Sequence, residues 1–177
     1  MFWAFSNQRW RTNGWALAAA LVAAGCTGRP PETSVPAKTV SDWFPIKVGG
    51  QVVQMQIALN PAEMSRGLME RRDLGPDQGM LFVYPEPQPM SFWMRDTPLP
   101  LDIGFFDRDG VLRETYAMQP FDEAPIRSRD QRLQFALEMN QRWYHEHGVR
   151  PGAQLDLAAL REALKARGAA PEDFGLR

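Results

Sequence analysis

Basic runs, paired cysteines and long apolar runs are scarce in this sequence. Its 177 residues contain 20 Lys and Arg against 21 Asp and Glu, for a formal net charge of -1. Because no run of Lys and Arg forms a basic stripe, the chain lacks a surface that neutralises phosphates, and we expect no nucleic-acid binding. The single cysteine, Cys26, excludes an internal disulfide. The fold must therefore be stabilised by its hydrophobic core.

Histidines are equally few, and His145 and His147 are the two in the chain. On a helix, residues two positions apart point to different sides, so this pair does not indicate a metal site. No serine lies at a motif spacing from either histidine, which leaves nucleophilic hydrolysis unsupported. We therefore predict no metal and no cofactor, and we assign no catalytic residue from the sequence.

The N-terminal residues resemble an export signal. Arg9 and Arg11 precede the apolar stretch WALAAALVAA (residues 15–24), which is too short to span a bilayer. Cys26 ends the string AAGC, which resembles the lipobox of bacterial lipoproteins, and Thr27 follows it. The resemblance implies a lipid on Cys26, export to the periplasmic side of a bacterial membrane, and attachment to the outer membrane, since two or more acyl chains hold a protein durably on a membrane. The alternative is a secreted protein whose cysteine is incidental.

Composition divides the chain into four segments. We predict a signal peptide over residues 1–25 and a lipid-anchored tether over residues 26–41, where Pro, Thr and Ser dominate and large apolar side chains are scarce. Residues 42–157 carry the periodic apolar patterns of a folded domain. Residues 158–177 are predicted to form a C-terminal helix and tail, with Asp156 as the helix cap and leucines along one stripe.

The folded segment favours β-structure. Residues 44–59 alternate apolar and polar side chains around a Gly-Gly turn, which is typical of a hairpin. The string NPAE at residues 60–63 carries the capping signals of a short helix, and DRDG at residues 107–110 has strong hairpin chemistry. Short strands at close spacing predict a mainly β fold, an antiparallel jelly-roll-like sandwich or barrel with short helices and a C-terminal helix.

Several strings in fixed order resemble a known family. They are RGLMERRDL at residues 66–74, GMLFVY at 79–84, FWMRDTPLPLDIGFFD at 92–107 and LEMN at 137–140. Together they are similar to the bacterial and archaeal family called domain of unknown function 192, over about residues 50–157. The resemblance implies a jelly-roll-like sandwich, frequently behind an export signal. It implies no settled activity, so the function must be argued from side chains.

Charged residues interrupt the aromatic stretch at residues 92–107. The strand period puts Trp93 and Arg95 on the face opposite Phe92, and it puts Asp102 opposite the neighbouring apolar residues. The leading hypothesis is a ligand groove in an envelope accessory module that binds a saccharide or a cell-wall fragment. Its lining would comprise Trp93, Arg95, Asp96, Asp102 and Arg66.

Three alternatives remain open for the same residues. Arg95 or Arg66 could pair with Asp96 or Asp102 as a structural staple, since a guanidinium suits a bidentate carboxylate contact. Asp96 and Asp102 could instead divide acid and base roles in a hydrolase, although two carboxylates alone are a weak signal and we do not favour an enzyme. The third alternative is a purely structural or protein-interaction domain. The sequence does not indicate an oligomeric state.

Overall fold

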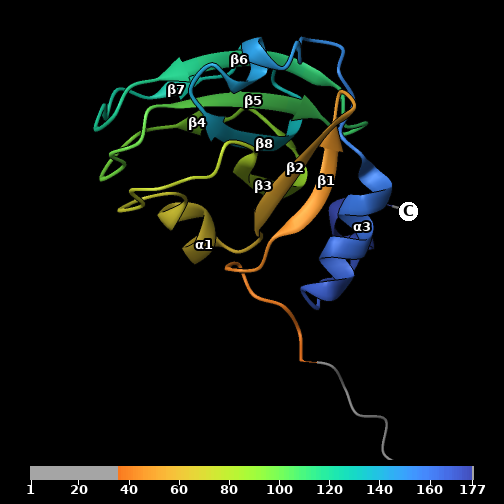
Figure 1. Cartoon of the computed structure of the whole chain (residues 1–177). Coiled ribbons are helices and arrows are strands. Elements are labelled where there is room, and N and C mark those ends of the chain that lie inside the picture. Colours follow the sequence, from red (N-terminus) through yellow and green to blue (C-terminus); the bar gives the residue numbers. More distant parts are fainter. Residues whose placement is uncertain (1–35, 177) are drawn as a thin grey trace, which may run out of the picture. The chain divides into compact units, whose positions relative to one another are not determined.

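A six-stranded sheet forms the centre of the computed structural model, which describes residues 36–176 (Figure 1). Its strands lie in the order β1-β2-β3-β8-β5-β6, and β4 and β7 form a small separate sheet. The strands are β1 (Phe44–Val48), β2 (Gln51–Ala58), β3 (Gln78–Gln88), β4 (Ser91–Phe92), β5 (Leu101–Asp107), β6 (Leu112–Met118), β7 (Ile126–Arg127) and β8 (Leu133–Asn140). The predicted signal peptide, Cys26 and the tether up to residue 35 lie outside the described residues.

Short helices complete the fold. They are α1 (Pro61–Arg66), α2 (Trp143–Glu146), α3 (Leu157–Ala166) and the 3-10 helix η1 (Pro171–Phe174). Between residues 36 and 176, none of these helices has the length and apolar character needed to cross a membrane. The prediction of a mainly β fold with short helices and a C-terminal helix is confirmed.

The central sheet is mixed and open. Strands β2 and β3 pair in parallel across the connection through α1, whereas the other neighbouring strands pair antiparallel. At one end, residues 152–156 bond to both edges of the sheet, through isolated bridges of Val48 with Leu155 and of Val111 with Gln154. The sheet therefore curls without closing into a continuous barrel.

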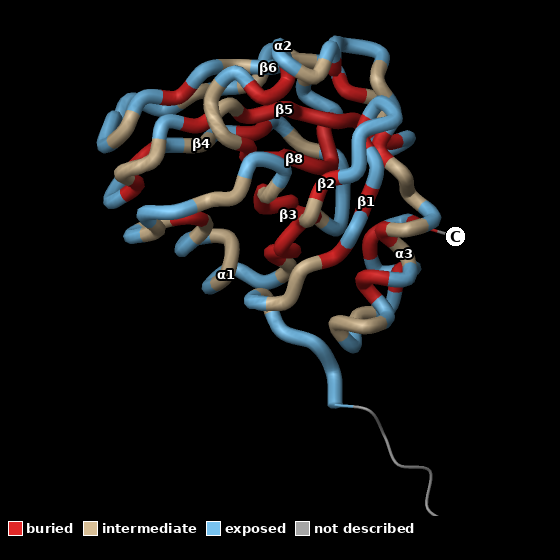
Figure 2. The backbone as a smooth tube through the Cα atoms, in the orientation of Figure 1, coloured by how far each residue is buried: buried red, intermediate tan, exposed pale blue. Residues whose placement is uncertain are grey.

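Both faces of the central strands β3, β8 and β5 are largely buried, as the red segments of Figure 2 show, whereas alternate residues of the edge strands β1 and β6 are exposed or partly buried. One face packs against α2, α3 and η1, with Phe106, Trp143 and Leu160 in its core. The other face is covered by α1, the small sheet and loops, and Phe82, Leu101 and Phe105 belong to its core. Neither face is therefore free for a row of charged residues, because each face is the floor of a separate hydrophobic core.

Local capping signals explain how α1 is placed. The Asn60 side chain accepts from the amide of Glu63, and Glu63 Oε2 accepts from the amide of Leu59 at 2.8 Å. The other oxygen of the Glu63 carboxylate lies 2.6 Å from Arg167 Nη2, beyond the end of α3. This ion pair is buried, and Arg167 also donates to the carbonyl of Ile57 at the end of β2. The start of α1 is thus tied to the C-terminal helix.

Helix α3 begins and packs as the sequence predicts. Asp156 accepts from two amides of the first turn, and Leu160 and Leu164 are fully buried against the sheet. The residues predicted as the end of the tether are ordered against the domain. The amide of Lys38 donates to the Ala166 carbonyl at 2.8 Å, and Val40 packs beside the core under α1.

Candidate functional site

A carboxyl group lies in the buried surface of the central sheet. Glu138 is in β8, whose sequence LQFALEMN is otherwise largely apolar. The strand register places Glu138 between Met80 of β3 and Ile103 of β5, and both neighbours belong to the core under α1. Only 5% of the surface of Glu138 is exposed. The sequence thus brings an acid into the middle of an apolar layer.

This carboxyl group has no compensating partner. Among residues 36–176, no hydrogen bond or ion pair reaches the Glu138 side chain. Burial alone raises its pKa to about 8, so the group is mostly protonated at neutral pH. Burial also raises the pKa of the nearby Tyr84 phenol, and the charge on Glu138 raises it further.

A cavity of about 400 Å³ opens onto Glu138. Phe82 and Tyr84 of β3, Phe92 of β4 and Trp93 supply aromatic lining. The remaining lining residues come mainly from α1 and the loop after it: Pro61, Met64, Ser65, Arg66, Gly67, Leu68 and Met69, with Ser91 and Thr97 opposite. The cavity therefore combines one buried acid with aromatic and apolar side chains and several hydroxyl groups, a mixture found in small-molecule sites.

Gly67 ends α1 and keeps part of this space open. Its φ of 47° lies in the region that favours glycine. A Cβ atom at this position would lie 3.3 Å from the Phe82 ring and 3.9 Å from Glu138 Oε2. A larger side chain would therefore strain the backbone and fill space beside the carboxyl group.

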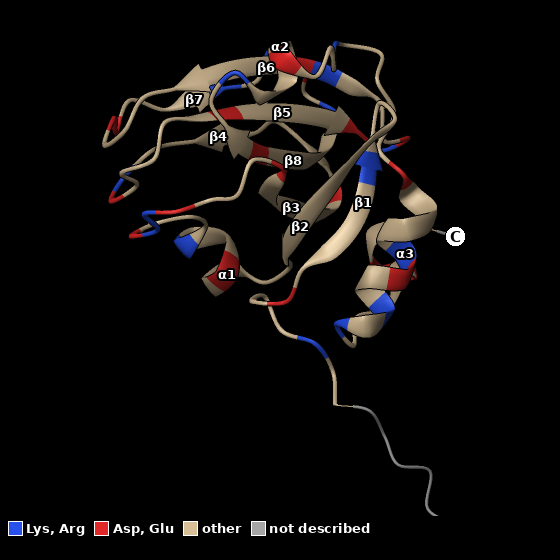
Figure 3. Cartoon of the chain, in the orientation of Figure 1, with Lys and Arg blue, Asp and Glu red and all other residues tan. Residues whose placement is uncertain are grey.

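Three loops are joined at the mouth of the cavity. The amide of Glu70 donates to the Asp96 carbonyl at 2.7 Å, and the amide of Phe121 donates to the Thr97 carbonyl at 3.1 Å. Glu70, Asp96 and Phe121 all adopt positive φ, which is uncommon for residues other than glycine. The loops lie together on the left in Figure 1, and charged residues concentrate at their tips in Figure 3. The backbone network holds these loops in one arrangement.

Trp93 lines the cavity, and 45% of its surface is exposed. The guanidinium carbon of Arg95 is 4.0 Å from the centre of the Trp93 ring, within the range of a cation–π contact. Arg95 Nη2 is also 2.8 Å from Glu123. Arg95 is therefore engaged in holding Trp93 and is not a lining residue of the cavity.

Two other predicted residues lie at the same end of the molecule. Arg66 lines the mouth of the cavity, where its guanidinium is exposed and 3.2 Å from Glu70. Asp96 is exposed, and its backbone carbonyl joins the loops. Trp93, Arg66, Arg95 and Asp96 thus gather around one opening, although Arg95 and Asp96 act there as supports.

Asp102 lies on the other face of the sheet. Its carboxylate accepts from the amide of Arg142, just before α2, at 2.8 Å. Burial raises the pKa of Asp102, the Arg142 amide opposes this shift, and Glu146 adds to it. The sheet separates Asp102 from Trp93, so the predicted groove does not contain both. For the same reason, Asp96 and Asp102 do not form the carboxylate pair that the hydrolase hypothesis requires.

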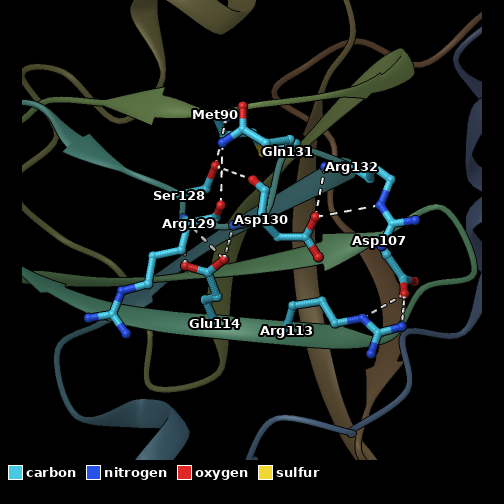
Figure 4. Close-up of polar contacts among 9 residues, drawn as sticks. All are labelled: Met90, Asp107, Arg113, Glu114, Ser128, Arg129, Asp130, Gln131 and Arg132. Carbon is cyan, nitrogen blue, oxygen red and sulfur yellow. Dashed lines mark hydrogen bonds and ion pairs between the residues drawn. The ribbon is translucent and has the colours of Figure 1, made fainter.

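A second hollow of about 440 Å³ lies near the turn between β5 and β6, lined by Asp107, Arg113, Asp130 and neighbouring residues. Figure 4 shows that four of its charged residues are in contact with one another or with the backbone: Asp107, Arg113, Asp130 and Arg132. Asp107 accepts from Arg113, and Glu114 accepts from the amides of Arg129 and Asp130. These contacts fix the loop after β7, so we assign this hollow a structural role.

Glu138 is the functional candidate that the sequence interpretation missed. The alternation of β8 does contain a signal for it, because Ala136, Glu138 and Asn140 share one face of a strand that is otherwise largely apolar. An acid on a face that must be buried is unexpected on structural grounds alone. The side-chain amide of Asn140, two residues further along β8, donates to the carbonyls of Leu74 and Gly75.

Two crystal structures are similar to this fold. A protein from Sinorhizobium meliloti 1021, provisionally described as a transcription regulator, shares 33% identity with a TM-score of 0.61, over 68% of this chain and 95% of its own. A protein of unknown function from Novosphingobium aromaticivorans DSM 12444 shares 32% identity with a TM-score of 0.62, over 70% of this chain and 94% of its own. No curated protein is significantly similar to the chain.

The family model described as DUF192, Uncharacterized ACR, COG1430, matches residues 44–157. The match begins at the first residue of β1 and ends at the start of α3, so it includes the central sheet, α1 and the Glu138 cavity. The chain belongs to the DUF192 family.

Proposed function

We propose that this domain is a ligand-binding module of the bacterial cell envelope and that its binding site is the Glu138 cavity. The observation that carries the proposal is the unpaired carboxyl group at the floor of the cavity. Burying an acid without a partner destabilises a fold, and residues that stability does not explain are candidates for function. A bound molecule would supply the hydrogen bonds or the charge that Glu138 lacks.

A saccharide or a cell-wall fragment fits the rim of this cavity. Trp93 presents an exposed aromatic ring there, and Arg95 covers part of it, which holds the ring in position. Rigid aromatic side chains offer contact area at low entropic cost. Phe92 lies deeper and is fixed by Phe82, with ring centres 5.0 Å apart in an edge-to-face arrangement. A ring with one apolar face and several hydroxyl groups could contact Trp93 and reach Glu138.

Replacing Trp93 with Ala tests this proposal. We expect binding of cell-wall saccharides and muropeptides, measured by saturation-transfer NMR and calorimetry, to weaken at least tenfold, or by about 1.4 kcal/mol. The melting temperature should fall by no more than about 4 °C, because the side chain is half exposed.

Asp102→Asn provides the matched control, because it changes a carboxylate on the other face of the sheet and keeps an acceptor for the Arg142 amide. Its binding should equal that of the unchanged protein. Equal binding by the Trp93→Ala variant, or no binding by the unchanged domain across the panel, would refute a saccharide site at this rim.

We further propose that the protein is exported and held on the periplasmic side of the outer membrane by lipid on Cys26. The support is the string AAGC after a short apolar stretch. Replacing Cys26 with Ser should move the protein from the membrane fraction to the soluble periplasmic fraction, because the acyl chains that anchor it would be lost. Fractionation and immunoblotting measure the change. Membrane retention of the Cys26→Ser variant would contradict lipid anchoring.

A further inference from the structure

We propose that the group which reaches the floor of the Glu138 cavity is an organic ammonium cation. This inference rests on the proposed function, because it names the chemistry of the group that the same cavity binds. Two features of the lining lead to it: one buried acid at the floor, and walls that consist largely of aromatic rings and thioethers.

The first feature is the charge of the floor. Glu138 is the one acidic residue among those that line the cavity, and it is more than nine-tenths buried. Within residues 36–176, no basic side chain pairs with it. Arg66 is the one basic lining residue, and its guanidinium is exposed at the mouth beside Glu70. A cation that enters the cavity would therefore meet an acid without competing with a resident cation.

The second feature is the chemistry of the walls. The faces of aromatic rings carry partial negative charge and attract cations, most strongly when water is excluded. Phe82, Tyr84, Phe92 and Trp93 bring four rings to one cavity. Met64 and Met69 add polarisable sulfur atoms, which suit a large and soft group. An ammonium group with alkyl substituents matches these walls and the acid together, whereas an anion would be repelled by the ring faces.

The alternative is a neutral ligand that accepts a hydrogen bond from protonated Glu138. The two cases differ in the sign of their pH dependence. A cation stabilises the carboxylate, so its binding releases the proton that Glu138 holds below about pH 8, and its affinity should rise by about tenfold per pH unit up to that point. A neutral acceptor needs the proton, so its affinity should be level at lower pH and should fall above about pH 8.

Other titratable groups near Glu138 do not produce the same transition. Burial raises the pKa of the Tyr84 phenol in β3 and of the Tyr144 phenol in α2, and the charge on Glu138 adds to the shift of each. A single proton released between pH 6 and pH 8 is therefore the property of Glu138.

Two matched pairs of probes test the inference by calorimetry at pH 6, 7, 8 and 9. Choline is compared with 3,3-dimethylbutan-1-ol, which has the same shape without the charge, and butylammonium is compared with butan-1-ol. We expect the cation of at least one pair to bind tenfold or more tightly than its neutral partner at pH 9. That advantage should shrink toward pH 6.

Glu138→Gln should remove both the advantage and its pH dependence, because it keeps the shape of the side chain without the charge. Phe92→Leu provides a second variant that keeps an apolar wall. It should weaken the cation several-fold and leave the neutral probe nearly unchanged.

Equal binding within both pairs, or a cation advantage that survives Glu138→Gln, would overturn the inference. If neither cation binds but neutral saccharides do, the proposed binding function stands and the ammonium inference is wrong. If neither the cations nor the saccharides bind, both proposals are wrong.

Discussion

Replacing Glu138 with Gln is expected to make the folded domain more stable at pH 8 and above. The pKa of Glu138 rises from an ordinary value of 4.5 to about 8 on folding, so the folded state holds a proton that the unfolded chain releases. The stability that the protonated Glu138 gives the folded state relative to its ionised form is fully present below about pH 4.5 and is lost as pH rises toward 8. At about 1.4 kcal/mol per pKa unit, the loss reaches at most about 5 kcal/mol. Gln cannot ionise and avoids this loss.

Urea unfolding between pH 5 and pH 9 measures the effect. The two proteins should have similar free energies of unfolding near pH 5, and the variant should be more stable by several kcal/mol at pH 9. Glu123→Gln is the control, since it removes an exposed carboxylate that pairs with Arg95 and should change the free energy by about 1 kcal/mol or less. Parallel pH profiles for the unchanged protein and Glu138→Gln would show that the carboxyl group is not desolvated.

Replacing Arg167 with Ala is expected to destabilise the domain by about 3–5 kcal/mol. Arg167 and Glu63 are 6% and 16% exposed, and loss of one member leaves the other charge buried without its partner. The variant also loses the contact from Arg167 to the Ile57 carbonyl at the end of β2. The start of α1 should loosen, because Glu63 also belongs to its N-terminal cap.

Thermal and urea unfolding of Arg167→Ala measure this loss. Lys165→Ala is the matched control in the last turn of α3, since its ion pair with Glu162 is exposed and should contribute about 0.5 kcal/mol or less. A double-mutant cycle with Glu63→Gln should give a coupling energy of more than about 1 kcal/mol. Similar losses for the Arg167 and Lys165 variants would contradict a stabilising role for the buried pair.

The local elements of the fold could be predicted because their signals lie within a few residues of each other. The Asn60 cap, the Asp156 cap and the turn at residues 107–110 all form as expected. The parallel pairing of β2 with β3 could not be predicted from such local signals. It depends on which strands meet after α1, and this choice is decided by packing across the whole sheet.

The candidate site was predicted in part for the same reason. Alternation correctly put Asp102 on the face opposite Leu101 and Ile103, whereas Trp93 follows the two-residue β4 and lines the same cavity as Phe92. It could not show that Trp93 and Asp102 belong to different layers, because period-2 patterns do not indicate what covers each face. The role of Glu138 could not be predicted from the sequence because the residues that line the cavity with it come from β3, α1 and the segment after β4, which are distant in sequence.

The bond between Lys38 and α3 has a mechanical consequence. The Lys38 amide is held by the carbonyl of Ala166, the residue next to Arg167, and Arg167 in turn holds Glu63 at the start of α1. Helix α1 is one wall of the Glu138 cavity. Tension applied to the chain at its N-terminal side would thus act in series on α3, on the buried ion pair and on that wall, so it would change the shape of the cavity that we propose as a binding site.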